Sequence, residues 1–157
     1  MFNILTFVGF HTWLSLVALA SGVILVVGLL EGRAAPRWAA LFFVTAIATN
    51  VTGFMFPFTA LLPSHIVDII SSVVLLITLF ARYARHFAGA WRWVYAVGVV
   101  ITTYFLVFVA IAQIFAKVPA LASPTQTNFA IAQAMLLLIA IIVGIKAVKK
   151  FHPAPGT

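Results

Sequence analysis

Hydrophobic residues occupy five long stretches of the chain, and the short segments between them hold most of the charged residues. A helix needs about 20 mostly apolar residues to cross the hydrocarbon core of a bilayer. Each stretch is close to that length. The pattern therefore predicts an all-α polytopic membrane protein, with five transmembrane helices packed as one bundle in a single domain over residues 1–157. The predicted spans cover approximately residues 4–30, 38–58, 64–81, 91–115 and 126–148.

The composition supports this assignment. Of the 157 residues, 65% are hydrophobic and only 7% are charged, whereas a soluble domain carries about 25% charged residues. Such a chain could not cover a water-facing surface, so a soluble enzyme, a secreted scaffold and a disordered protein are excluded. Because the chain has no cysteine, disulfides, cysteine-ligated zinc and iron–sulfur clusters are excluded as well.

The basic residues predict the orientation in the membrane. Positive charge accumulates on the cytoplasmic side of membrane proteins, and with five spans the basic segments fall on alternate sides without an exception. We therefore expect a multi-pass protein of the bacterial inner membrane, with its N-terminus outside and its C-terminus in the cytoplasm. The formal charge of +7 then reflects topology, and the lipid bilayer rather than nucleic acid is the expected partner. The inner set is Arg33, Arg37, Arg82, Arg85, Arg92, Lys146, Lys149 and Lys150; the outer set is Lys117 alone.

Strongly polar side chains inside the spans are the candidate site. An ionisable group at the bilayer centre costs about 2.5–3.5 kcal/mol on insertion scales, and it usually faces the interior of a bundle. His65 and Asp68 are three residues apart, so they share a helix face. All the candidates fall in the outer half of their spans. The main candidates are His11, His65 and Asp68, and the secondary ones are Asn50, Gln113 and Gln133.

Three interpretations of this group are open. In the first, Asp68 bonds to a histidine and to the first-turn amides of its helix, while His65 lies at the headgroup level and the group is structural. In the second, His11 and Asp68 orient a small ligand, such as a quinone head or a lipid, in a pocket that opens outward, and a proton relay is a variant of this arrangement. In the third, His11, His65 and Asp68 hold a divalent metal, or the two histidines hold a haem iron. The second and third both require the first and third helices to be neighbours.

Four stretches carry a resemblance to known proteins: HTWLSLVALASG, VTGFMFPFT, ARYARHFAGAWRW and FAKVPALASPTQ. On these stretches the chain resembles a group of short, functionally uncharacterised multi-pass proteins of bacterial inner membranes. The resemblance implies the cellular location. It implies no reaction and no ligand.

The leading functional hypothesis is a protein that binds a small ligand or cofactor, of the quinone, haem or metal type, in its outer leaflet. One alternative is an accessory subunit of a larger membrane complex with no ligand of its own. Another is a small transporter or proton-coupled channel, which would need homo-oligomerisation because five helices enclose little volume. The sequence favours a binding protein over an enzyme, since it contains no GxSxG elbow, no Walker loop and no paired catalytic carboxylates.

Overall fold

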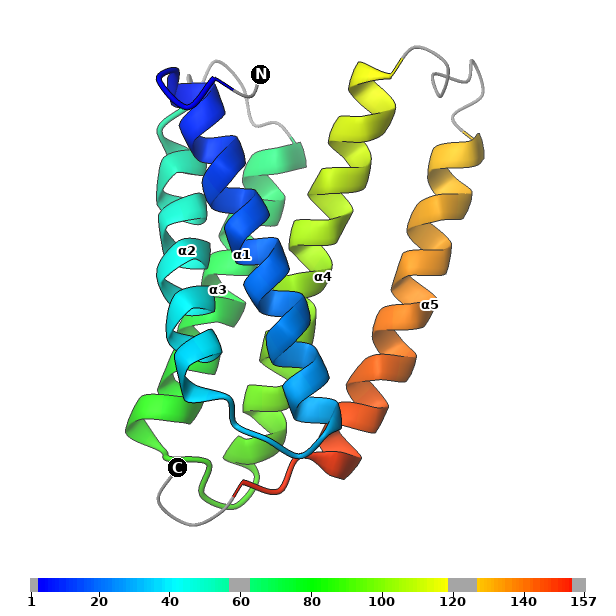
Figure 1. The fold of residues 1–157 in the computed structure, drawn as a ribbon. Helices are drawn as coiled ribbons and strands as arrows, with labels where there is room; N and C mark the ends of the chain where they lie inside the picture. Colours follow the sequence, from blue (N-terminus) through cyan, green and yellow to red (C-terminus); the bar gives the residue numbers. More distant parts are fainter. Residues whose placement is uncertain (1–2, 57–62, 119–126, 154–157) are drawn as a thin grey trace.

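A computed structural model describes residues 3–56, 63–118 and 127–153. Within these ranges every regular element is a helix, which confirms the all-α prediction. Successive helices run in opposite directions beside one another (Figure 1). The elements are α1 (Phe7–Leu30), α2 (Pro36–Phe54), α3 (Pro63–Leu79), the π-helix η1 (Phe80–Ala84), α4 (Trp91–Lys117) and α5 (Thr127–Lys150).

Four helices are long and apolar enough to cross a membrane, which indicates a membrane protein. They are Phe7–Leu30, His65–Ala84, Trp91–Lys117 and Thr127–Lys150. The second predicted span does not meet that standard: α2 has 19 residues and carries Arg37, Asn50 and three threonines. It begins two residues earlier than predicted, with a proline in its first turn, where the missing N–H has no helical partner to lose. It ends at Phe54 instead of residue 58, and residues 57–62 lie outside the described part.

The third span is longer than predicted. Its α-helix ends at Leu79, but the chain continues directly through the π-helix η1 to Ala84. The wider π turn extends the helical segment to 20 residues, from His65 to Ala84. Short π segments inside helices are rare and are often found at functional sites, and η1 contains one of the basic residues, Arg82.

The two ends of the bundle differ in chemistry. One end gathers the end of α1, the start of α2, η1, the start of α4 and the end of α5 (Figure 1). We call it the basic end, because these segments and their loops carry the predicted inner set of arginines and lysines. The other end, which we call the histidine end, holds the start of α1 with His11 and the start of α3 with His65.

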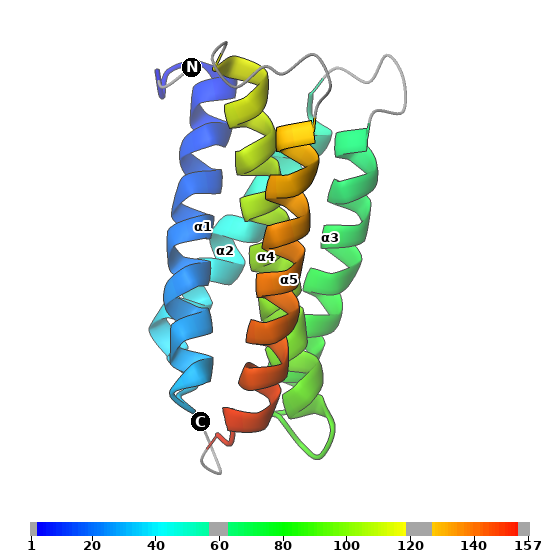
Figure 2. The ribbon, with the colours of Figure 1, turned by 90° about the vertical axis from the view of Figure 1, so that its right-hand side faces the viewer.

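The helices do not pack in the order that a site shared by His11, His65 and Asp68 requires, which is α1 beside α3. Helix α1 packs against α2 and α4, and α3 packs against the same two helices. In the described residues α1 and α3 form no interface with each other, so the expectation that they are neighbours is wrong. Helix α5 packs mainly against α4, with a smaller contact to α1, and lies on the opposite side of the bundle from α2 (Figures 1 and 2).

Small residues allow the helices to approach closely, as expected in lipid. On α1, Gly22 lies against Phe42 of α2 and Thr103 of α4, and a Cβ there would come within 2.7 Å of the Phe42 ring. On α4, Gly98 lies directly against the Thr78 side chain of α3. On α5, Ala130 near the start of the helix is exposed and takes no part in such an approach.

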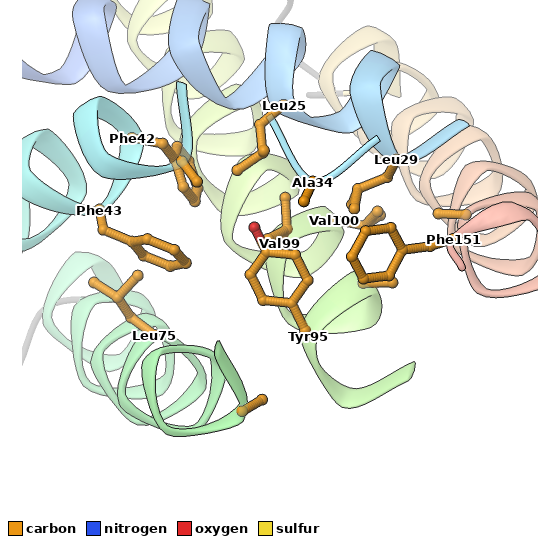
Figure 3. Packing of buried hydrophobic residues seen from close by; sticks show 14 of the residues in the cluster. Leu25, Leu29, Ala34, Phe42, Phe43, Leu75, Tyr95, Val99, Val100 and Phe151 are labelled. Carbon is orange, nitrogen blue, oxygen red and sulfur yellow. The ribbon is translucent and has the colours of Figure 1, made fainter. Parts of the chain in front are cut away.

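The best-packed core lies toward the basic end (Figure 3). The Tyr95 ring of α4 and the Phe151 ring, which follows α5, are fully buried with centroids 5.5 Å apart. Phe43 of α2 approaches the same tyrosine at 6.3 Å. This aromatic contact attaches the end of the chain to α4, although α5 itself buries little of its surface.

Candidate functional site

His11 faces α2 rather than α3. It lies in the second turn of α1, half-buried, and its Nδ1 is 2.8 Å from the hydroxyl oxygen of Thr52. The Phe56 ring stands edge-on to the imidazole, with centroids 5.1 Å apart. The Thr52 hydroxyl also donates to the carbonyl oxygen of Ala48 at 2.7 Å. When its hydrogen is used there, the Thr52 oxygen is left to accept an N–H from Nδ1 of His11.

Asp68 reaches the same helix from the other side. It lies in the second turn of α3, half-buried, and its carboxylate packs against the backbone of Gly53. A Cβ on residue 53 would lie 2.7 Å from Oδ2, so the carboxylate would have to shift if residue 53 carried a side chain. Thr52 and Gly53 are consecutive. The imidazole of α1 and the carboxylate of α3 therefore converge on adjacent residues of α2.

His65 lies one turn before Asp68 and is almost completely buried, with 3% of its surface exposed. Its side chain is thus enclosed by protein instead of lying open at the headgroup level. It interacts electrostatically with Asp68. Since the two residues share a helix face, this acid–imidazole pair is set by the sequence spacing alone.

Hydrogen bonds to Asp68 are missing from the described part of the chain. Among the side-chain hydrogen bonds found in residues 3–56, 65–118 and 127–153, none has the Asp68 carboxylate as its acceptor, and His65 has a partner of its own. The expected bond to the first-turn amides of α3 stays a prediction, because the side chains at the start of that helix lie outside the described residues. Polar groups removed from water normally find partners, because leaving them without one is costly. Asp68 has accepting capacity that the described residues do not use.

Asn50 extends the polar contact one turn deeper. Its buried amide nitrogen donates to the hydroxyl oxygens of Ser72 and Ser71 on α3, at 3.1 and 3.4 Å. This bridge fixes α2 against α3 beside Asp68. The three α2 residues Asn50, Thr52 and Gly53 thus connect polar groups from both neighbouring helices, and we call this group, with His11, His65 and Asp68, the polar layer.

The two glutamines lie elsewhere. Gln113 is exposed near the end of α4. Gln133 is buried between α5 and α4, where its amide nitrogen donates to the carbonyl oxygen of Phe108 at 3.1 Å and its Oε1 has no partner. Because α5 does not pack against α2 or α3, the structure does not bring Gln133 to the polar layer.

A metal or haem site receives little support from this arrangement. No group of three or more His, Asp and Glu side chains in the described part is close enough to hold a metal ion. The two histidines also approach from helices that are separated by α2, and Thr52 engages Nδ1 of His11. The arrangement suits hydrogen bonding and proton exchange better than metal ligation.

Sequence reasoning missed residues at both ends of the bundle. Thr52 was not among the candidates, although its hydroxyl contacts Nδ1 of His11, and Gly53 was expected only to let helices approach closely. Arg82 looked like one of several topology charges. The structure buries it to 8% exposure, with Nη1 donating to the Tyr95 hydroxyl oxygen at 3.2 Å.

Fold and polar layer together define a helical membrane protein with a group of ionisable and amide side chains between its helices at one end. No family model, no curated protein and no solved structure matches the chain. Its function must therefore be argued from its own residues.

Proposed function

We propose that the chain is a five-span protein of the bacterial inner membrane that binds a small ligand at the histidine end. The ligand donates a hydrogen bond to Asp68 at the α2–α3 interface, beside His65, while His11 belongs to the polar layer on the other side of α2. A quinol-type head group, which carries hydroxyl donors on an apolar ring, is the ligand class that suits this chemistry best.

The five-span topology has two supports. At roughly 1.5 Å per residue, the 19 residues of α2 extend about 28 Å, close to the hydrocarbon thickness of about 30 Å. Helix α2 also packs against α1 and α3 in the same bundle (Figure 1). The basic residues favour a cytoplasmic basic end and a periplasmic histidine end, and the resemblance to short bacterial inner-membrane proteins agrees with that location.

The single observation that carries the ligand proposal is the carboxylate of Asp68. Intramembrane carboxylates are costly and normally mark a functional pathway or site. Here the carboxylate is half-buried at the α2–α3 interface, and none of the hydrogen bonds among the described residues ends on it. A ligand hydroxyl would supply the missing donor. Since an ionised carboxylate only accepts hydrogen bonds, the quinol form should bind better than the quinone.

The experiment measures binding of a short-chain quinol to the full chain in lipid nanodiscs by isothermal titration calorimetry. A hydrogen bond to a charged group contributes about 1.5–3 kcal/mol, so Asp68→Asn should weaken binding by roughly 10- to 150-fold. Glu31→Gln is the matched control, because it removes the chain's only other acidic side chain at the basic end. It should leave binding unchanged.

Other outcomes identify the alternatives. Equal affinities for wild type and Asp68→Asn would refute the proposal. A Soret band or stoichiometric metal in protein purified in mild detergent, lost in His65→Ala, would replace the quinol with a haem or metal. Proton movement in liposomes that stops in Asp68→Asn would favour the transporter. Absence of all three would favour the accessory subunit.

A further inference from the structure

A second, separate feature lies at the basic end, where Arg82 is buried. The residue belongs to η1, and 8% of its surface is exposed. One guanidinium nitrogen, Nη1, donates to the Tyr95 hydroxyl oxygen. Nothing in the polar layer at the histidine end requires an arginine in this position, so its burial needs an explanation of its own.

Three aromatic rings surround the guanidinium. Its central carbon lies 5.5 Å from the ring centroids of Tyr83 and Phe87 and 5.6 Å from that of Tyr95. Cation–π contacts at these distances offset part of the cost of removing the charge from water. Aromatic faces offer no hydrogen-bond acceptor in the guanidinium plane, however, and a guanidinium has five N–H donors.

The backbone around Arg82 is built to hold this arrangement. The π turn of η1 shifts the helix register at Arg82. Arg85 follows η1, and the next two residues, His86 and Phe87, adopt left-handed conformations with φ of 45° and 62°. Such conformations are unfavourable for residues with a Cβ and persist only where the surroundings enforce them. Here they turn the buried Phe87 ring toward Tyr95, with centroids 4.9 Å apart.

The charge of Arg82 is not balanced by a carboxylate in the described part of the chain. The sequence contains two acidic side chains. Glu31 pairs with Arg33 at the surface. Asp68 lies 14 residues earlier on the same helical segment, roughly 21 Å away along the axis.

The remaining donors of Arg82 are accessible from outside. Among fully buried side-chain nitrogen and oxygen atoms of the described residues, Gln133 Oε1 alone lacks a partner. The guanidinium nitrogens that do not bond to Tyr95 must therefore reach the molecular surface. They reach it at the basic end, where Arg85 stacks on Trp91 at 5.7 Å and Arg92 on Trp93 at 5.4 Å.

We propose that Arg82 binds the phosphate of an anionic membrane lipid at the basic end. A planar guanidinium matches phosphate oxygens through two parallel N–H donors, and basic sites between transmembrane helices on the cytoplasmic side suit anionic head groups. The rings hold the guanidinium in one orientation, and the phosphate supplies the missing counter-charge. Inorganic phosphate has the same chemistry and is the alternative source.

The experiment compares thermal unfolding of the full chain in neutral detergent with added phosphatidylglycerol, phosphatidylcholine or inorganic phosphate. Native mass spectrometry counts the lipids retained. Phosphatidylglycerol should raise the melting temperature by several degrees and remain bound, while phosphatidylcholine should do neither. Arg82→Gln should abolish the difference. Arg82→Lys, which keeps the charge but loses the planar fork, should reduce it. Arg33→Gln, at an exposed arginine of the same end, is the matched control and should retain it.

Each of the other outcomes of this experiment leads to a different conclusion about the phosphate site. Equal stabilisation of the wild type by both lipids would overturn the proposal, and this comparison holds even when Arg82→Gln fails to fold. Equal loss in Arg33→Gln and Arg82→Gln would assign the effect to general surface charge and would also overturn it. Stabilisation by inorganic phosphate without lipid retention would keep the phosphate site but identify its occupant as a solution anion.

Discussion

The contact between Asp68 and Gly53 predicts how Gly53→Ala changes the free energy of unfolding. Replacing Gly53 with alanine would place a Cβ 2.7 Å from Oδ2, 3.3 Å from Cγ and 3.6 Å from Oδ1 of Asp68. Non-bonded carbon atoms are most favourable at about 3.5–4.0 Å, so the carboxylate would have to retreat by roughly half an ångström or more. Asp68 is short and its stem is fixed on α3, so the two helices must separate or the side chain must leave its position.

The magnitude follows from two opposing effects. Overpacking a closely packed interface costs about 1–3 kcal/mol, whereas alanine in place of a mid-helix glycine contributes about 0.5–1 kcal/mol of stability. Gly53→Ala should therefore lower the free energy of unfolding by about 1 kcal/mol in the wild type. In an Asp68→Ala background the clash is gone, and the same change should raise stability by about 0.5–1 kcal/mol.

The assay is a double-mutant cycle, with unfolding in mixed micelles of dodecyl maltoside and sodium dodecyl sulfate followed by circular dichroism. The expected coupling energy is about 1–3 kcal/mol, well above the additivity limit of about 0.5 kcal/mol for independent sites. Asp68→Asn is the matched control, because asparagine has the same size without the charge, and it should not relieve Gly53→Ala. Additive effects of Gly53→Ala and Asp68→Ala would show that the carboxylate does not lie against α2, and the ligand proposal would lose its geometry.

Two further predictions concern the α4–α5 side of the bundle. Gln133→Leu removes the buried Oε1 that has no partner. This removal is worth about 1–3 kcal/mol and offsets the lost hydrogen bond to Phe108, so the free energy of unfolding in the same assay should stay level or rise. A loss above about 1 kcal/mol would contradict this prediction. Phe151→Ala removes a fully buried ring from its contacts with Phe87 and Tyr95, and it should cost about 3–5 kcal/mol. The neighbouring exposed change His152→Ala should stay within about 0.5 kcal/mol, and equal effects of the two would refute the attachment of the chain end.

The candidate site could be predicted in part. The spacing of His65 and Asp68 predicts that both lie on one helix face, and the structure has them one turn apart on α3 with His65 buried and Asp68 half-buried. Sequence patterns could not show which helix covers that face, because α1 and α2 both carry glycines that allow a neighbouring helix to approach closely. Because α2 covers that face, it separates His11 from the pair formed by His65 and Asp68. His11 contacts Thr52 of α2 and Asp68 contacts Gly53 of α2. Gln113 and Gln133 lie outside the polar layer.

The sequence by itself determined the helical class, the apolar lengths and the division of charge between the two ends, since each depends only on residues close together in the chain. The tertiary structure decided which helices are neighbours and which polar side chains become enclosed. Arg82 is the clearest case. Because it lies at the end of an apolar stretch, the sequence predicts an arginine in a loop that faces water. The π turn of η1 and the left-handed backbone at His86 and Phe87 rotate it into a group of aromatic rings. That rotation depends on Tyr95, which is distant in sequence, so local patterns carry no sign of it.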